Sequence, residues 1–137
     1  MAAQPPSRSP DEAPAPNEED GEALTCDRLT RDFSLFQRRR GHRFSSDDVV
    51  TAWAAMASVP RPRRVLDLGC GVGSVLLQVA WCAPEAELVG VEAQAVSFAL
   101  LRRNIAHNGV ASRVLALHGD LRDVAVQARV GGGFDLV

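Results

Sequence analysis

Three acidic residues and one glycine-rich loop are the parts of this sequence best suited to binding a ligand. Asp67 stands two residues before the loop Gly69–Gly73, which reads GCGVG, and Glu92 and Asp120 follow further along the chain. A carboxylate beside such a loop repels a pyrophosphate at the start of a helix, but it suits an ammonium or a sulfonium group. Glu92 can accept hydrogen bonds from both hydroxyls of a ribose, and Asp120 suits the exocyclic amine of an adenine.

These groups are expected at the ends of short apolar runs that have the composition of buried strands. The runs alternate with helical patterns, which predicts an α/β fold with a parallel sheet and flanking crossover helices. Ligands of such sheets bind beyond the carboxyl ends of the strands, where the three acids are expected to meet. The expected strands are 65–68, 88–91, 114–117 and a fourth beginning at 134–137, and the expected helices are 45–58, 74–81, 93–107 and 121–128.

The three acids predict a ligand with a ribose, an adenine amine and a cationic amino-acid end, which together describe S-adenosylmethionine. A dinucleotide-binding loop would instead read G-x-G-x-x-G. Here Ser74 stands where the third glycine would fall, and Asp67 disfavours a pyrophosphate. An NAD-dependent dehydrogenase is therefore the weaker alternative, which a cofactor-competition binding assay would separate.

The same residues resemble a known family. Residues 65–73, VLDLGCGVG, are similar to the first motif of class I S-adenosylmethionine-dependent methyltransferases. Glu92 matches the acidic residue after the second strand of that family, and Gly119–Asp120 matches its third-strand motif. The resemblance covers about residues 38–137 and implies a Rossmann-like fold with S-adenosylmethionine as the cofactor.

The resemblance also implies roles for individual residues. Asp67 would lie near the ammonium of the methionine portion, which the loop glycines approach closely, and Glu92 would hold the ribose. Asp120 and the backbone of Leu121 would hold the adenine, and Phe44 would close over the cofactor. The cofactor-binding residues expected in this way are Phe44, Asp67, Gly69, Gly71, Gly73, Glu92, Asp120 and Leu121.

A second segment narrows the resemblance. Residues 37–47, QRRRGHRFSSD, look like the segment before the glycine loop in bacterial valine-tRNA adenine-N6-methyltransferases, within the methyltransferase small domain group. His42 stands where that group usually has an aromatic residue, and Asn104 and Asn108 also resemble it. The resemblance implies methylation of a base in RNA, with adenine N6 of a tRNA as the expected target. A methyltransferase acting on proteins or small molecules, and a non-catalytic product that binds partners, are the alternatives.

A basic cluster surrounds Gly41 and consists of Arg38, Arg39, Arg40 and Arg43. Guanidinium groups match phosphate oxygens in geometry and charge, so these four arginines are candidate contacts to nucleic acid. The alternative is a solvated loop.

The two ends of the chain carry separate expectations. Residues 1–22 are acidic and rich in proline, which predicts a disordered tail, and residues 23–137 are expected to be the N-terminal, cofactor-binding part of a methyltransferase domain. In the resembled family the fourth strand runs into an Asn-Pro-Pro-aromatic motif that holds the target amine. Val137 stands before that point, so we expect a fragment whose catalytic residues lie beyond it. Alone, such a fragment would be inactive and marginally stable, and a protein partner could complete its fold.

Composition excludes several classes of function. All 15 basic residues are arginines, which rules out a lysine Schiff base or a P-loop lysine, and the net charge of −2 is not that of a polycation. Three cysteines without metal-type spacing predict neither a metal site nor a disulfide scaffold. No apolar run approaches the roughly 20 residues of a membrane span, and no signal peptide is evident. We expect a cytoplasmic or nuclear protein that is not secreted and does not bind membranes.

Overall fold

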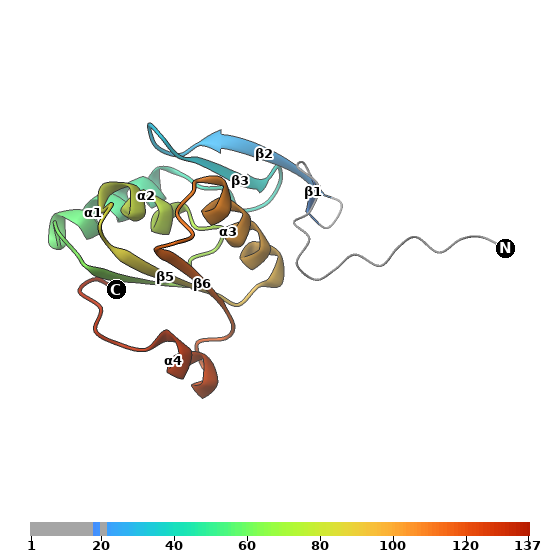
Figure 1. The fold of residues 1–137 in the computed structure, drawn as a ribbon. Coiled ribbons are helices and arrows are strands. Elements are labelled where there is room, and N and C mark those ends of the chain that lie inside the picture. Colours follow the sequence, from blue (N-terminus) through green and yellow to red (C-terminus); the bar gives the residue numbers. More distant parts are fainter. Residues whose placement is uncertain (1–17, 20–21) are drawn as a thin grey trace.

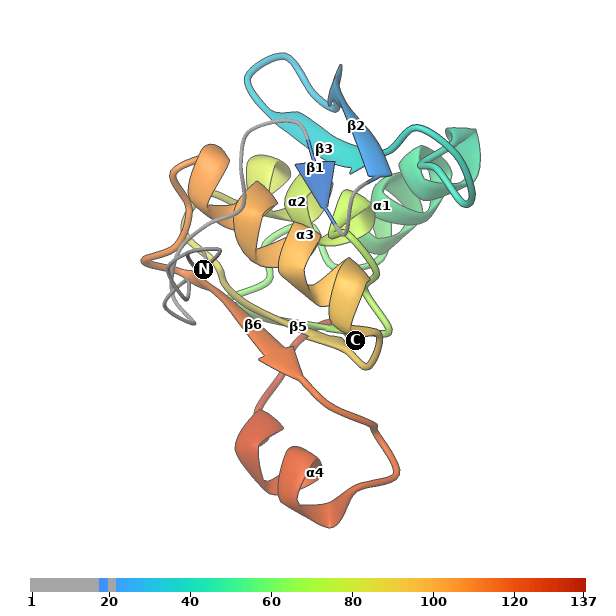
Figure 2. The ribbon, with the colours of Figure 1, turned by 90° about the vertical axis from the view of Figure 1, so that its right-hand side faces the viewer.

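The computed structural model describes residues 18–19 and 22–137, which are arranged in layers (Figures 1 and 2). A small antiparallel sheet lies on a layer of three helices, α1 to α3. These helices cover one face of a parallel sheet, and α4 lies against its other face. The elements are β1 (Glu18–Glu19), β2 (Glu22–Arg28), β3 (Ser34–Arg38), α1 (Ser46–Ser58), β4 (Arg64–Leu68), α2 (Ser74–Cys82), β5 (Glu87–Glu92), α3 (Ala95–His107), β6 (Val114–His118) and α4 (Val124–Val130).

The parallel sheet confirms the α/β fold expected from the sequence. Its strands run in the order β4-β5-β6, with Leu66 opposite Val89 and Val89 opposite Leu115. Leu136 pairs with Val65 through an isolated parallel bridge, on the edge of β4 that β5 leaves open. β5 and β6 therefore lie on one side of β4, and Leu136 lies on the other. The strand order reverses at β4, and in sheets of this kind the ligand crevice lies at the carboxyl end of the strand where the order reverses.

Apolar side chains alternate between the two faces of the strands and form two cores. On the helix side, Val65 packs with residues of α2 and α3 in the larger core. On the α4 side, Leu66 and Val89 pack with Val126 in a smaller one. Gly90, in the middle of β5, lets α2 approach closely, because a Cβ there would lie 2.6 Å from Cδ2 of Leu76.

Helix α1 begins where the sequence predicts, but it presents a different face to the core. Its N-terminus has a capping box, in which the Ser45 hydroxyl accepts from the Asp47 amide at 3.3 Å and the Asp48 carboxylate accepts from the Ser45 amide at 3.1 Å. The helical spacing of Val49, Val50, Trp53 and Met56 in the sequence predicts that this helix packs in the core through these residues. Met56 does pack against the core, but the prediction is wrong for the other three, because Trp53 is 71% exposed and both valines are largely exposed. The helix instead buries the small residue Ala52 against α2, since alanine allows a close approach between helices.

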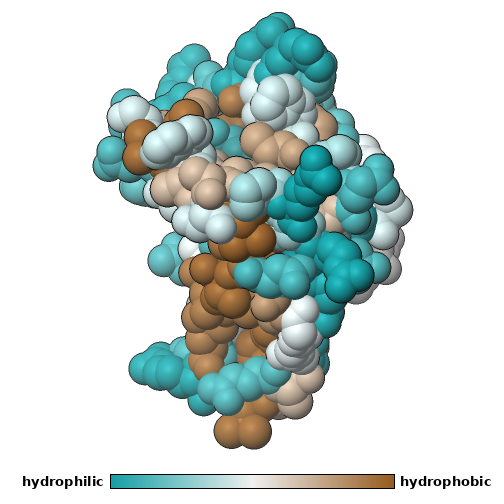
Figure 3. Space-filling view, turned by 90° about the vertical axis from the view of Figure 1, so that its left-hand side faces the viewer, coloured by the Kyte–Doolittle hydropathy of each residue, from teal (hydrophilic) through white to brown (hydrophobic). Residues whose placement is uncertain are grey.

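An apolar hollow of about 340 Å³ lies between α1 and the C-terminal residues, and Ala55, Leu66 and Leu136 are among the residues that line it. Figure 3 shows hydrophobic side chains gathered on this side of the molecule, at the level of the sheet and α4. No helix within residues 18–19 and 22–137 has the length and apolar character needed to cross a bilayer.

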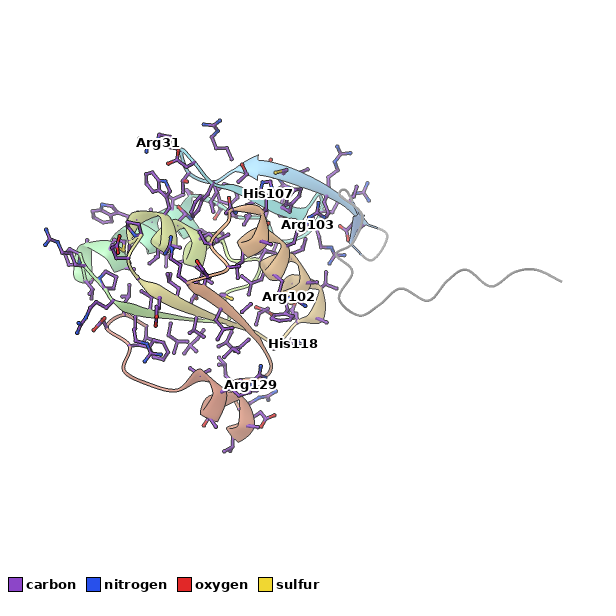
Figure 4. The ribbon with its side chains drawn as sticks, in the orientation of Figure 1. Arg31, Arg102, Arg103, His107, His118 and Arg129 are labelled. Atoms are coloured by element: carbon purple, nitrogen blue, oxygen red, sulfur yellow. The ribbon has the colours of Figure 1, made fainter. Side chains whose placement is uncertain are left out.

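The hairpin formed by β2 and β3 has no counterpart in the sequence-based expectations. Its strands pair in antiparallel register, with Cys26 opposite Phe36. The turn between them carries no Gly or Pro signal; Thr30 closes it by accepting from the Phe33 amide at 3.0 Å. The hairpin rests on α3, where the Arg103 guanidinium lies 3.8 Å from the centroid of the Phe36 ring; Figure 4 labels Arg103 and its neighbour His107 on this helix.

The disordered tail expected over residues 1–22 is described only in part. Glu18, Glu19 and Glu22 lie in strands, because β1 pairs with the start of β2. Residues 1–17 and 20–21 lie outside the described residues.

Candidate functional site

A cavity of about 350 Å³ lies at the carboxyl ends of β4 and β5, where the sheet topology predicts a ligand site. Three segments of the chain form its walls. The glycine loop after β4 forms one wall, Glu92 and the start of α3 form the second, and the segment from His42 to Asp48 forms the third.

The glycine loop folds over the end of β5. The amides of Gly69 and Cys70 both donate to the carbonyl of Val91, at 2.8 and 3.0 Å. Gly71 and Gly73 have φ angles of 56° and 93°, which side chains other than that of glycine rarely adopt.

The two positive-φ glycines have different surroundings. Gly73 caps α2, and a Cβ there would lie 2.7 Å from Cδ1 of Leu101, so this position is needed for packing. A Cβ at Gly71 would meet nothing within 4 Å, and Gly71 lines the cavity. The space in front of Gly71 is therefore available to a ligand.

Glu92 links the loop to the sheet. Its side chain is buried, with Oε2 accepting from the Gly71 amide at 2.8 Å and Oε1 accepting from the Gln94 amide at 2.7 Å. Each carboxylate oxygen can accept more than one hydrogen bond, so Glu92 can hold these amides and a ligand diol together.

Asp67 is held in an environment that disfavours its charge. Strand alternation turns it to the helix face of β4, the face on which Val65 lies. Its Oδ2 is buried and has no hydrogen-bond partner among the described residues. Burial, together with the nearby carboxylates of Asp48 and Glu92, raises the pKa of Asp67 to about 6. A buried carboxylate with one unpartnered oxygen at the wall of a cavity fits a cationic group of a ligand.

Phe44 is held at the cavity by the hairpin. Its amide donates to Oε1 of Gln37 at 2.9 Å, and Nε2 of Gln37 donates to the Asp27 carboxylate at 2.8 Å. Five of the predicted cofactor-binding residues thus line one cavity: Phe44, Asp67, Gly69, Gly71 and Glu92.

Two other predicted residues lie away from this cavity. Asp120 is half-exposed and pairs with Arg122, with Nε 3.0 Å from Oδ1 and Nη2 2.5 Å from Oδ2. These hydrogen bonds hold the pKa of Asp120 at about 2. Leu121 packs against the smaller core on the α4 side of the sheet. Adenine binding by this pair remains a prediction.

The basic cluster divides into two parts. Arg43 is tied into the hairpin, because it pairs with Asp27 at 2.8 Å and donates to Thr25 Oγ1 at 3.0 Å. Arg38 pairs with Glu22. Arg39 and Arg40 are exposed in a separate hollow around Gly41, and their guanidinium groups have no partner among the described residues.

A family model described as the methyltransferase small domain matches residues 43–136. The chain belongs to the methyltransferase small domain family. The matched residues include the glycine loop, Glu92 and Phe44, so the family assignment rests on the segments that build the cavity.

Named relatives agree with this family. The tRNA1(Val) (adenine(37)-N6)-methyltransferase of Porphyromonas gingivalis is 29% identical over 110 residues, covering 78% of this chain and 43% of the relative. The release factor glutamine methyltransferase of Geobacter sulfurreducens is 33% identical over 91 residues, covering 66% of this chain and 30% of the relative. The crystal structure of P. horikoshii TYW2 in complex with MeSAdo is 26% identical, with a TM-score of 0.61, and covers 73% of this chain and 37% of that chain. This methyltransferase small domain thus spans less than half the length of these relatives.

The sequence did not predict a ligand-binding role for His42, Asp48, Gln94 or Ser97, all of which line the cavity. Asp48 follows the pattern of an acid in a first helical turn, as does Asp47, and only the tertiary position of α1 distinguishes them. The cysteine of the loop, Cys70, is buried, and burial raises the pKa of its thiol, so it is not an activated nucleophile. The described residues hold no group of three or more His, Cys, Asp or Glu side chains able to bind a metal ion.

Replacing Gly71 with valine is expected to block the cavity of this methyltransferase small domain. The valine side chain would enter the space in front of the loop, and a residue at φ 56° costs about 1–2 kcal/mol of backbone strain. S-adenosylmethionine binding, measured by calorimetry, should be lost while the circular dichroism of the helices is kept. Gly109→Val, another open position with positive φ, at 67°, is the matched control and should keep binding. Binding that survives in Gly71→Val would contradict the location of the site.

Proposed function

We propose that this methyltransferase small domain binds S-adenosylmethionine in the cavity at the carboxyl ends of β4 and β5 and serves methyl transfer. The observation that carries the proposal is the buried Oδ2 of Asp67, which has no partner among the described residues. S-adenosylmethionine carries an ammonium and a sulfonium, the kind of charge that such an oxygen attracts. The structural neighbour in complex with MeSAdo supports the same reading of this fold.

The residues present fit this cofactor. Glu92 holds the amides of Gly71 and Gln94 and keeps lone pairs for the two ribose hydroxyls. Gly71 leaves open space for the methionine portion, and Phe44 covers it from the hairpin side. Asp120 and the backbone of Leu121 are proposed for the adenine.

The chemistry that S-adenosylmethionine supplies when bound is an electrophilic methyl group on its sulfonium sulfur. Asp67, ionised above a pH of about 6, would balance positive charge in the cavity. Its burial makes that attraction stronger than it would be in water. Glu92 and the glycine loop would fix the orientation of the methyl group, and Phe44 would exclude water. These residues contribute positioning and electrostatics, which account for much of the rate enhancement in transfer reactions.

We propose that the methyl acceptor is a base in RNA, with adenine N6 of a tRNA as the specific target. The tRNA-modifying relative supports this target by name. The exposed arginines Arg39 and Arg40 support it by charge, because they immediately precede the segment that carries His42 and Phe44 to the cavity. The release factor methyltransferase relative supports a protein acceptor as the alternative, but RNA accounts better for two exposed guanidinium groups that have no partner among the described residues.

Replacing both Arg39 and Arg40 with alanine is expected to weaken tRNA binding at least about fivefold near physiological salt, because two phosphate contacts are lost. The log–log slope of affinity against salt should become about 2 units shallower. Fluorescence anisotropy with labelled tRNA measures both quantities. Arg129→Ala, on α4 at the other face of the sheet (Figure 4), is the control and should leave both unchanged. Failure of the unmodified chain to bind tRNA, or equal affinity in the double variant, would count against an RNA acceptor.

A further inference from the structure

Asn104 on α3 and Asn108, the C-cap residue one turn later, pair with the free edge of β3. Oδ1 of Asn104 accepts from the Phe36 amide at 2.7 Å, and its Nδ2 donates to the Phe36 carbonyl at 2.9 Å. Asn108 makes the same pair of bonds to Ser34, at 2.9 and 2.8 Å. Four residues of helix rise about 6 Å, and two residues of strand rise about 6.7 Å. Because these spacings are similar, the two carboxamides can hydrogen-bond to the backbone of alternate residues of β3, as a neighbouring strand would.

Asn104 has a second contact that Asn108 lacks. Its Nδ2 also donates to the carbonyl of Val72 in the glycine loop, at 2.9 Å. The side chain is fully buried, so both of its N–H donors are used, one on the hairpin and one on the loop. The remaining donor of Asn108 goes to the carbonyl of Asn104 in the same helix, at 2.7 Å, and reaches no wall of the cavity.

The hairpin carries the contact across to the opposite wall. The residue after Phe36 is Gln37, whose side chain is 2% exposed and whose Oε1 holds the amide of Phe44 at 2.9 Å. Val72 and Phe44 both line the cavity. Hydrogen bonds therefore link the glycine loop to Asn104 and Asn104 to Phe36, the backbone joins Phe36 to Gln37, and a further hydrogen bond links Gln37 to Phe44.

We infer that Asn104 is a positioning residue that holds the glycine loop and the Phe44 segment at the separation the ligand requires. The inference rests on the proposed function only in naming S-adenosylmethionine as that ligand. Without Asn104 the backbone groups of Phe36 and Val72 lose their partners inside the protein, and both walls are free to shift. Asn108 supports the hairpin alone.

The test compares Asn104→Ala with Asn108→Ala, which removes the same kind of contact to β3 but none to the loop. Hydrogen exchange of the ligand-free chain should show the amides of Gly73 and Phe44 exchanging at least about tenfold faster in Asn104→Ala than in Asn108→Ala. Calorimetry at a temperature at which both variants are folded should show S-adenosylmethionine binding at least about fivefold weaker in Asn104→Ala and within about twofold of the unmodified chain in Asn108→Ala. Asn104→Asp keeps the acceptor for the Phe36 amide but loses the donors to the carbonyls of Phe36 and Val72, so it should behave as Asn104→Ala does.

The exchange and binding results for the Asn104 and Asn108 variants decide whether Asn104 is a positioning residue. Equal exchange and equal binding in the Asn104 and Asn108 variants would overturn the inference, as would unfolding of both Asn104 variants, which would assign Asn104 to folding alone. If the unmodified chain binds S-adenosylmethionine and Asn104→Ala binds it equally well, the positioning role fails and the proposed function stands. If the unmodified chain does not bind it but the exchange difference appears, the proposed function fails and the link between the walls stands.

Discussion

Replacing Asp67 with asparagine is expected to stabilise the folded chain above pH 6 while weakening the binding of S-adenosylmethionine at least about tenfold. Burial raises the pKa of Asp67 from 3.8 to about 6. The folded chain therefore keeps a proton at pH values at which the unfolded chain has lost it, and this contribution to stability disappears as the pH rises from about 4 to about 6. A shift of about two pKa units corresponds to up to about 3 kcal/mol. Asparagine does not ionise, so the variant does not lose this stability as the pH rises.

Urea unfolding between pH 4.5 and pH 7.5 measures this effect. The stability advantage of Asp67→Asn over the unmodified chain should grow with pH and level off above about pH 6.5. Asp120→Asn is the control; Arg122 helps to hold the pKa of Asp120 at about 2, so its removal should bring no gain at neutral pH. An advantage of Asp67→Asn that does not change with pH would contradict the raised pKa of the buried Asp67 carboxyl.

Asp67→Asn should also change how the affinity for S-adenosylmethionine depends on pH. A cationic ligand favours the ionised carboxylate, so the affinity of the unmodified chain should rise as the pH passes through about 6. The affinity of Asp67→Asn should show no such rise. A residue that lowers stability and raises affinity is typical of a functional site.

Replacing Glu92 with alanine is expected to weaken S-adenosylmethionine binding about a hundredfold. The change removes the acceptors for both ribose hydroxyls, and each hydrogen bond to a charged group contributes about 1.5–3 kcal/mol. It also releases the amides of Gly71 and Gln94, which Glu92 holds at 2.8 and 2.7 Å, so the loop loses its anchor.

Glu92→Gln separates these two effects in the same calorimetric experiment. It keeps the size of the side chain and one acceptor oxygen, and it should therefore fall between Glu92→Ala and the unmodified chain. Glu87→Gln, at the exposed opposite end of β5, is the matched control and should bind normally. Unchanged affinity in Glu92→Ala would show that Glu92 does not bind S-adenosylmethionine.

The sequence predicted the parallel sheet and the glycine loop because both are encoded locally. Apolar runs around Val65 and Leu88 alternate with helical patterns, and the glycines at 69, 71 and 73 stand where the backbone needs positive φ. The strand ends follow from the same pattern, which predicts that Asp67 and Glu92 lie together.

The features that the sequence did not predict depend on contacts between distant segments. The hairpin of β2 and β3 is held by Asn104 and Asn108, some 70 residues away along the chain. Trp53 points outward because α1 packs through the small residue Ala52. Hydrophobic periodicity favours burial of tryptophan over burial of alanine, so it does not predict this orientation. The pairing of Arg43 with Asp27, which leaves Arg39 and Arg40 as the exposed members of the basic cluster, likewise needs the hairpin to be in place.

Isothermal titration of the 137-residue chain with S-adenosylmethionine tests the central claim most directly. It requires neither an RNA substrate nor catalysis, and it reports on the cavity formed by the glycine loop, Asp67 and Glu92. The account predicts saturable binding at one site per chain, unaffected by an excess of NAD. Absence of binding by a folded chain, or displacement of S-adenosylmethionine by NAD, would contradict it.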